Sequence, residues 1–193
     1  PFPGVRAIGN YTVVETSPAT FRAVPNGGSG FTVKSSSAVF IGKPTDTRRN
    51  IIAGNHGHGI FIDSLSRHIV ISNALIGRVF GLSRPSGGAN LVDAFGNGGN
   101  GILISNGSSE NVVGGQETNA GNVIADNGGA GVRIDETAGV ANLVDPNLIT
   151  GNTGLGIDLN AAGRTPNDPG DADEGGNRGQ NFPEIANTLV DPN

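Results

Sequence analysis

Short aliphatic runs alternate along the chain with clusters of Gly and Asn, and one phrase recurs almost unchanged. It consists of an Asn, two aliphatic residues, two short residues, a second Asn, a Gly-rich triplet, and then Gly, an aliphatic residue, any residue and another aliphatic residue. Full copies occupy residues 50–63, 122–135 and 147–160, and a looser copy covers residues 97–105. Such a repeat is one supersecondary unit that buries its apolar side by stacking on its neighbours. The pattern therefore predicts a solenoid.

Within the phrase, aliphatic residues alternate with a period of two, which indicates strands rather than helices. In residues 59–63 this places Ile60 and Ile62 inward and Phe61 and Asp63 outward. The equivalent inward pairs are Ile102/Ile104, Val132/Ile134 and Ile157/Leu159. Asn97 and Asn122 are 25 residues apart, as are Asn122 and Asn147. We therefore expect coils of about 25 residues, stacked so that the inward side chains form aliphatic columns.

Asn and Gly recur at fixed places in the phrase. Asn bonds nearby backbone and tolerates bends, so we expect an internal ladder of side-chain hydrogen bonds formed by Asn55, Asn97, Asn127 and Asn152. Gly fits corners that need a positive φ, and we assign that role to Gly59, Gly101, Gly131 and Gly156.

We expect residues 1–193 to form a single β-helix. Residues 1–45 are less regular and are interpreted as irregular N-terminal coils, with strands at 11–15 and 21–24. Residues 46–163 form the regular rungs, with a loop inserted at 77–96. Residues 164–193 form an acidic loop and a closing segment.

The phrases at residues 119–132 and 155–160 resemble the right-handed parallel β-helix repeats, of the pectate-lyase-like kind, found in large bacterial secreted and surface proteins. Residues 165–183 are similar to the segment that often closes such helices. The resemblance implies an all-β, right-handed parallel β-helix (β-solenoid) in an extracellular or cell-surface location, in bacteria. It does not specify an activity, because the superfamily includes lyases, hydrolases, adhesins and inert scaffolds.

Charge and composition exclude several classes of partner. The formal net charge is −5, and the basic residues are scattered, whereas nucleic-acid binding requires clustered cations. No stretch approaches the roughly 20 apolar residues of a membrane span. The chain has no Cys, so disulfides and thiolate metal sites are ruled out. The sequence begins at Pro1, and we expect a processed product or a fragment.

The outward face of the strands offers one candidate catalytic set, Arg133, Asp135 and Asp158. A suitably spaced pair of carboxylates can cleave a glycosidic bond by acid–base chemistry. A lyase acting on an acidic glycan would instead use Ca²⁺ and a basic residue. The alternative is structural: Arg133 and Asp158 form a cross-strand ion pair, and Asp63 and Asp135 cap the turns that follow them.

The acidic loop provides a candidate calcium site. Calcium binds six to eight oxygen ligands at flexible spacing, and the candidate ligands are Asp168, Asp171, Asp173 and Asn177, with Glu174 as a spare. The alternative is a solvated loop that covers the last coil. His56 and His58 form an H-x-H pair that can bind zinc when other ligands converge, but the more ordinary interpretation is exposed turn residues.

The sequence thus favours a non-catalytic extracellular structural or adhesive element of a surface protein, stalk or self-stacking fibre. Open strand edges at the ends of a β-helix must be capped or paired, so we expect end-to-end self-association and contact with a cell-surface or extracellular polysaccharide. One alternative is a polysaccharide lyase or glycoside hydrolase acting through Arg133, Asp135 and Asp158. Another is a carbohydrate-binding module, disfavoured by an aromatic content of 5 % and a single outward Phe61.

Overall fold

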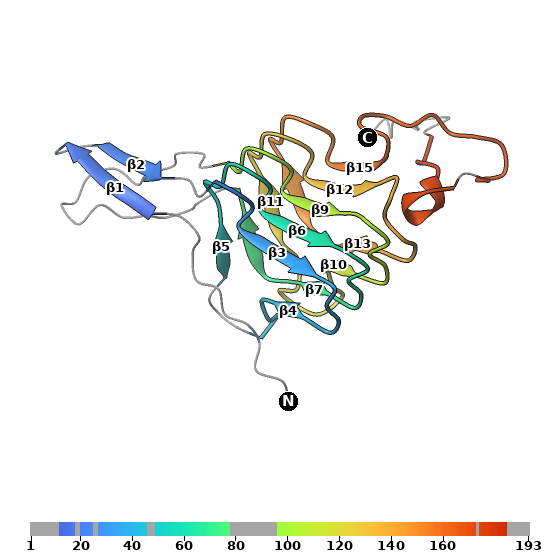
Figure 1. Cartoon of the computed structure of the whole chain (residues 1–193), viewed down its shortest axis with the longest axis horizontal. Helices are drawn as coiled ribbons and strands as arrows, with labels where there is room; N and C mark the ends of the chain where they lie inside the picture. Colours follow the sequence, from blue (N-terminus) through green and yellow to red (C-terminus); the bar gives the residue numbers. More distant parts are fainter. Residues whose placement is uncertain are drawn as a thin grey trace, which may run out of the picture.

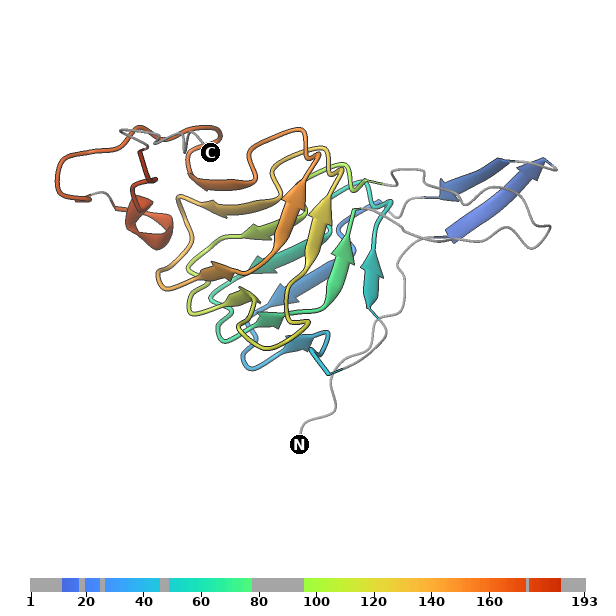
Figure 2. The same cartoon turned by 180° about the vertical axis from the view of Figure 1, so that it is seen from behind.

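The structure is a computed structural model that describes residues 12–17, 20–24, 27–45, 49–77, 96–172 and 174–184. Within these residues, thirteen strands, β3 to β15, form three parallel sheets, and successive coils of the chain stack along one axis so that each sheet extends along it (Figures 1 and 2). The chain visits the sheets in a fixed order, so each turn of the chain adds one strand to each sheet. The fold is therefore an all-β parallel β-helix, as predicted. Its right-handedness stays a prediction.

The strands have the following bounds. The first sheet contains β3 (Phe31–Lys34), β6 (Ile60–Asp63), β9 (Ile102–Ile104), β12 (Val132–Asp135) and β15 (Ile157–Asn160). The second contains β4 (Phe40–Ile41), β7 (Val70–Ile71), β10 (Val112–Gly114) and β13 (Leu143–Asp145). The third contains β5 (Asn50–Ile52), β8 (Ala74–Ile76), β11 (Val123–Ala125) and β14 (Leu148–Thr150). A short 3₁₀ helix, η1 (Gly176–Gly179), follows β15.

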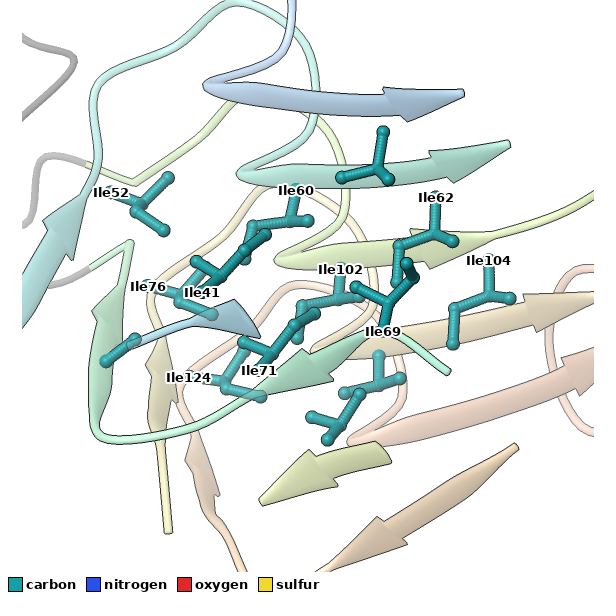
Figure 3. Packing of buried hydrophobic residues seen from close by; sticks show 14 of the residues in the cluster. Ile41, Ile52, Ile60, Ile62, Ile69, Ile71, Ile76, Ile102, Ile104 and Ile124 are labelled. Atoms are coloured by element: carbon teal, nitrogen blue, oxygen red, sulfur yellow. The ribbon is translucent and has the colours of Figure 1, made fainter. Parts of the chain in front are cut away.

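Aliphatic columns fill the space between the sheets (Figure 3). In the first sheet the register aligns Ile60 with Ile102 and Val132, and all three side chains are fully buried. The other sheets contribute their own columns, of which Ile52, Ile76 and Ile124 form one and Ile41, Ile71 and Val113 another. Burial of an Ile or Val side chain contributes about 1.5–3 kcal/mol, so these columns are the main source of stability. The predicted inward positions are confirmed as buried in β6, β9 and β12.

Asn side chains bond from coil to coil inside the corners. The predicted ladder is present: the side-chain amide of Asn55 donates to Asn97 Oδ1 at 2.6 Å, Asn97 donates to Asn127 at 2.8 Å, and Asn127 donates to Asn152 at 2.9 Å. The sequence did not predict two further contacts of the same kind. Asn111 donates to Asn142 at 2.8 Å, and Asn122 donates to Asn147 at 2.9 Å. Each buried amide thereby keeps the hydrogen bonds that its burial would otherwise cost.

The predicted coil length of about 25 residues is wrong for most of the helix. Asn partners in the predicted ladder are separated by 42, then 30, then 25 residues. The prediction failed because it aligned Asn97 with Asn122, which belongs to a different corner and bonds to Asn147. Corners absorb extra residues without disturbing the strand register. The loop predicted at 77–96 falls in the longest coil, but its residues 78–95 lie outside the described part of the chain.

The role predicted for the corner glycines is also wrong. Gly59, Gly101, Gly131 and Gly156 are absent from the positive-φ residues of the described chain. What they provide is space: a Cβ on Gly101 would lie 2.5 Å from the Ile124 side chain and 2.6 Å from the carbonyl oxygen of Gly131. No real Cβ tolerates such contacts, so the coils can approach closely only through glycine here.

The N-terminal strands differ from the expectation of irregular coils. β1 (Thr12–Ser17) and β2 (Thr20–Val24) pair antiparallel in a two-stranded sheet of their own. In Figure 1 this hairpin lies to one side of the stacked sheets. The parallel stack described here begins with β3, whose register with β6 is regular. The division of the whole chain into 1–45, 46–163 and 164–193 remains a prediction.

Candidate functional site

Arg133 and Asp158 lie side by side on the outward face of the first sheet. The register of β12 and β15 places them opposite each other. Arg133 Nη1 is 3.2 Å from Asp158 Oδ2, and the Asp158 side chain is only 7 % exposed. Asp158 also accepts the backbone N–H of Gly163 at 3.1 Å, while Arg133 Nη2 donates to the carbonyl of Asn160 at 3.2 Å. The pair therefore ties β12, β15 and the following turn together, in the geometry that the ion-pair interpretation predicts.

Asp135 and Asp63 occupy equivalent ends of their strands, where each caps the next turn. Asp135 Oδ1 accepts hydrogen bonds from the backbone N–H of Thr137 at 2.9 Å and from its hydroxyl at 2.6 Å. Asp63 Oδ1 accepts the backbone N–H of Ser64 at 2.8 Å. The capping role inferred from the sequence is confirmed at both positions.

Asp63 has two further partners. The amide of Asn106 donates to it at 2.6 Å and the ammonium group of Lys34 lies 3.3 Å away. The bond from Asn106 lowers the pKa of Asp63 below its ordinary value, with a smaller contribution from Lys34, against the opposing effect of burial. Asp63 is thus a buried carboxylate held in its charged form by structural contacts.

The three predicted catalytic side chains therefore share one face but each bonds to its own neighbours. Arg133 and Asp158 point toward each other, whereas Asp135 is directed at Thr137. A catalytic role for Arg133, Asp135 and Asp158 stays a prediction. Phe61, the outward aromatic, is partly buried and packs against His58 with ring centroids 5.7 Å apart.

The histidines have separate surroundings. His56 is exposed, as expected for a turn residue. His58 is half-buried, contrary to that expectation, because its Nδ1 accepts the backbone N–H of Asn100 in the next coil at 2.9 Å. Burial, with a smaller contribution from the charge of Arg133, lowers the pKa of His58. His58 therefore works as a neutral hydrogen-bond acceptor that joins two coils.

The predicted calcium ligands are divided between two places. Asp171 Oδ1 accepts the backbone N–H of Asn181 at 2.8 Å, and Asp168 Oδ2 accepts that of Ala172 at 3.0 Å. Asn177 instead bonds to Asn142, accepting its N–H at 2.9 Å and donating to its carbonyl at 2.6 Å. Asn177 thus continues the column of Asn side chains that Asn111 and Asn142 form at one corner of the coils.

The acidic loop retains one feature that favours a cation. In the described part of the chain, Asp168 Oδ1 is buried without a hydrogen-bond partner. The described residues contain no group of three or more His, Cys, Asp or Glu side chains placed to hold a metal. Asp173 lies outside those residues, and calcium binding stays a prediction.

A feature that the sequence reasoning missed lies at the C-terminal end of the stack, where β13, β14 and β15 are the outermost described strands of their sheets. Ile157 is 45 % exposed although it continues the fully buried column of Val132. Leu143 and Leu148 are also exposed. A hollow of about 610 Å³ opens here, between the inward faces of β13 and β15 and the chain from 163 to 183. The signal was available, because an outermost coil in any stack leaves one side of its core uncovered.

No family model, curated protein or solved structure matches the chain. The parallel β-helix therefore stands on the strand pairing and the stacked core described above. The resemblance to the pectate-lyase-like repeats stays an expectation from the sequence.

Proposed function

We propose that this chain is a non-catalytic extracellular structural or adhesive element, a β-helical segment of a surface protein, stalk or fibre that associates end to end. The observation that supports this proposal best is the uncovered C-terminal end. Its strands keep a free edge in the described part of the chain, and the core residue Ile157 reaches solvent. Free parallel edges bind further strands, so this end suits a neighbour that continues the stack.

The outward face of the first sheet supports the same proposal. Its buried carboxylates are occupied by structural contacts: Asp158 holds Arg133 and Gly163, and Asp63 holds Lys34 and Asn106. Acid–base catalysis needs a carboxyl group within hydrogen-bond reach of a substrate. The face is better suited to a rigid surface than to a reaction.

Among the described residues, no helix has the length and apolar character needed to cross a membrane.

End-to-end association is tested by sedimentation velocity over a range of protein concentrations, with electron microscopy of the largest species. We expect species that lengthen along one dimension as concentration rises. Ile157→Asp places a charge on the uncovered end and should abolish this growth. Leu65→Asp is the matched control, because Leu65 is 69 % exposed on the side of the stack. A wild-type chain that stays monomeric at every concentration would contradict end-to-end association.

The enzymatic alternative has its own test. Wild-type protein is incubated with acidic polysaccharides, and release of reducing or unsaturated ends is measured. We expect no turnover. Turnover that disappears in Asp158→Asn, with the fold intact by circular dichroism, would overturn the non-catalytic proposal.

A further inference from the structure

Asn106 differs from the other Asn residues that precede a Gly in the described part of the chain. Such Asn–Gly pairs begin there at Asn97, Asn100, Asn106 and Asn127. In an Asn–Gly pair the backbone nitrogen of the Gly can attack the side-chain amide carbon of the Asn and close a succinimide ring, since Gly has no Cβ to hinder the approach. The attack requires that the amide leave its contacts and that the backbone rotate. The reactivity of each pair therefore depends on how firmly the fold holds it.

The fold holds three of these pairs inside the contacts between coils. Asn97 and Asn127 are both 1 % exposed, and each donates its side-chain amide to the Asn of the next coil, at 2.8 and 2.9 Å. Asn100 Oδ1 accepts the backbone N–H of Ala130 at 2.8 Å, and the buried Gly101 donates to the Ala130 carbonyl at 2.9 Å. Ring closure at any of these pairs would break hydrogen bonds that join two coils.

Asn106 lies instead in an exposed turn that follows β9. Asn106 and Gly107 have left-handed φ angles of 49° and 71°, which Asn and Gly tolerate. Their backbone N–H groups donate to the hydroxyl and the carbonyl of Thr137, at 2.8 and 2.7 Å. Thr137 is itself exposed, so water can replace both bonds when the turn opens. Because exposed turns open at a lower free energy than buried corners do, the Gly107 nitrogen reaches the Asn106 amide more often than its equivalents do elsewhere.

We propose that the fold leaves Asn106 as a site of spontaneous deamidation. The Gly107 nitrogen forms a bond to Cγ of Asn106, the bond from Cγ to Nδ2 breaks, and the Gly107 N–H proton leaves with Nδ2 as ammonia. Water then opens the succinimide at either of its carbonyl groups, which gives Asp or isoaspartate at position 106. The reaction consumes only water and is independent of the function proposed above.

Deamidation changes a contact between two coils. The Asn106 side-chain amide donates to Asp63 Oδ1 at 2.6 Å, and the Asp63 side chain is only 7 % exposed. The product carries a carboxylate in place of that donor, so two negative charges face each other and one of them is buried. Lys34, 3.3 Å from Asp63, remains as its charged partner. Deamidation therefore weakens the link between β6 and the turn after β9, and aged protein is less stable than fresh protein.

The modification is tested by peptide mass mapping of the full chain during incubation in mildly alkaline buffer, with isoaspartate identified by fragmentation of the peptide backbone. We expect conversion at Asn106 to be at least about tenfold faster than at Asn97, Asn100 or Asn127, because buried corners open less often than exposed turns. The same chain unfolded in urea is the control, and there the advantage of Asn106 should largely disappear. Conversion at Asn106 that is no faster than at the other pairs, or an equal advantage in urea, overturns the proposal.

Two full-length variants test the consequence for Asp63. Asn106→Asp reproduces the product, and Asn106→Gly is the matched control, because Gly removes the amide donor without adding a charge and tolerates the positive φ. We expect Asn106→Asp to melt about 2–4 °C below Asn106→Gly, a shift of the size that one lost contact gives in a chain of this length. Equal melting temperatures in the two variants would contradict the repulsion of Asp63.

Discussion

The two ends of the described stack are built from the same kinds of strand, yet their cores differ in exposure. At the N-terminal end, formed by β3, β4 and β5, the inward residues Ile41 and Ile52 are 1 % and 0 % exposed. At the C-terminal end, formed by β13, β14 and β15, Val144 and Ile149 of the same columns are only partly buried, and Ile157 is exposed. The sequence phrase is therefore not what decides burial. The exposure of the same column differs with the end of the stack at which the residue lies.

The largest expected effect is a difference in stability between two variants, one at each end of the same column of side chains. Ile52 and Ile149 are its outermost described members. We expect Ile52→Ala to reduce the free energy of unfolding by about 2–5 kcal/mol, the usual cost of truncating a fully buried Ile. Ile149→Ala should cost less than half as much, because its side chain is already partly in contact with solvent. Urea denaturation of both variants measures the difference, and equal losses would mean that the C-terminal end is covered in solution.

A second pair of variants probes the same contrast at a corner. A Cβ on Gly101 would lie 2.6 Å from the Gly131 carbonyl oxygen, whereas on Gly156 it would meet only the Ile149 side chain, at an ordinary 3.7 Å. We expect Gly101→Ala to destabilise the protein by about 1–3 kcal/mol, as overpacking does. Gly156→Ala should be close to neutral in the same thermal melt. A large loss at Gly156 would indicate that another coil lies directly above it.

A third prediction concerns stability at acid pH. Acid should weaken the hydrogen bond between His58 and Asn100, which joins two coils away from the open C-terminal end. The pKa of His58 is lowered in the fold, so its contribution to stability is complete above its unfolded value of about 6.5. That contribution is lost as the pH falls through the folded value, because a protonated Nδ1 no longer accepts the N–H of Asn100. We expect a loss of about 0.5–1.5 kcal/mol, typical of one hydrogen bond.

The measurement is the melting temperature between pH 7.5 and 5, compared with that of His58→Gln. The variant should be less stable at pH 7.5 and should show a flatter pH profile. His56→Gln serves as the control, because His56 is exposed and should leave the profile of the wild type unchanged. If the pH profile flattens in the His56 variant instead, the pH dependence comes from His56, and the prediction for His58 is wrong.

The smallest expected effect is a gain in stability at the C-terminal end when calcium binds. Such a gain would reduce the difference in stability between the two ends of the stack. If Asp168, Asp171 and Asp173 hold calcium, millimolar Ca²⁺ should add about 0.4–1.4 kcal/mol of stability, given a dissociation constant of about 0.1–1 mM. The gain should appear as slower hydrogen exchange in residues 163–183 and not in β3 to β5. Asp168→Asn should remove it, while Glu174→Gln should retain it. A melting temperature that is unaffected by chelator rules out a structural calcium site.

The sequence predicted those features that depend on contacts within one repeat. Ile60 and Ile62 face inward because strand geometry alone requires alternation, and Asp63 and Asp135 cap their turns because the bonded N–H groups lie one or two residues away. Features that depend on the spacing between neighbouring coils were missed. Gly101 is needed for space below the Gly131 carbonyl, and the coils on either side of Asn97 are longer than 25 residues, because Asn97 bonds to Asn55 and Asn127, 42 and 30 residues away.

In the candidate site, one contact between coils was predictable and another was not. The Arg133–Asp158 pair was predictable, because strands one coil apart place such residues opposite each other. The Asn177–Asn142 contact was not, because the chain leaves the stack after β15 and returns at that corner. Nothing in the local pattern of an acidic loop indicates that one of its amides completes a corner of the solenoid.

The Asn contacts have a consequence for symmetry. At each step the side-chain amide donates toward the C-terminal coil and the carbonyl oxygen accepts from the N-terminal one. The chain of Asn-to-Asn bonds is therefore polar, since all of its bonds point in the same direction along the axis. Two identical ends brought together by a two-fold axis would oppose like groups, and their parallel strands would run in opposite directions. Any assembly that continues the corners must therefore use unlike ends, related by a screw operation along the axis, and its filaments are directional.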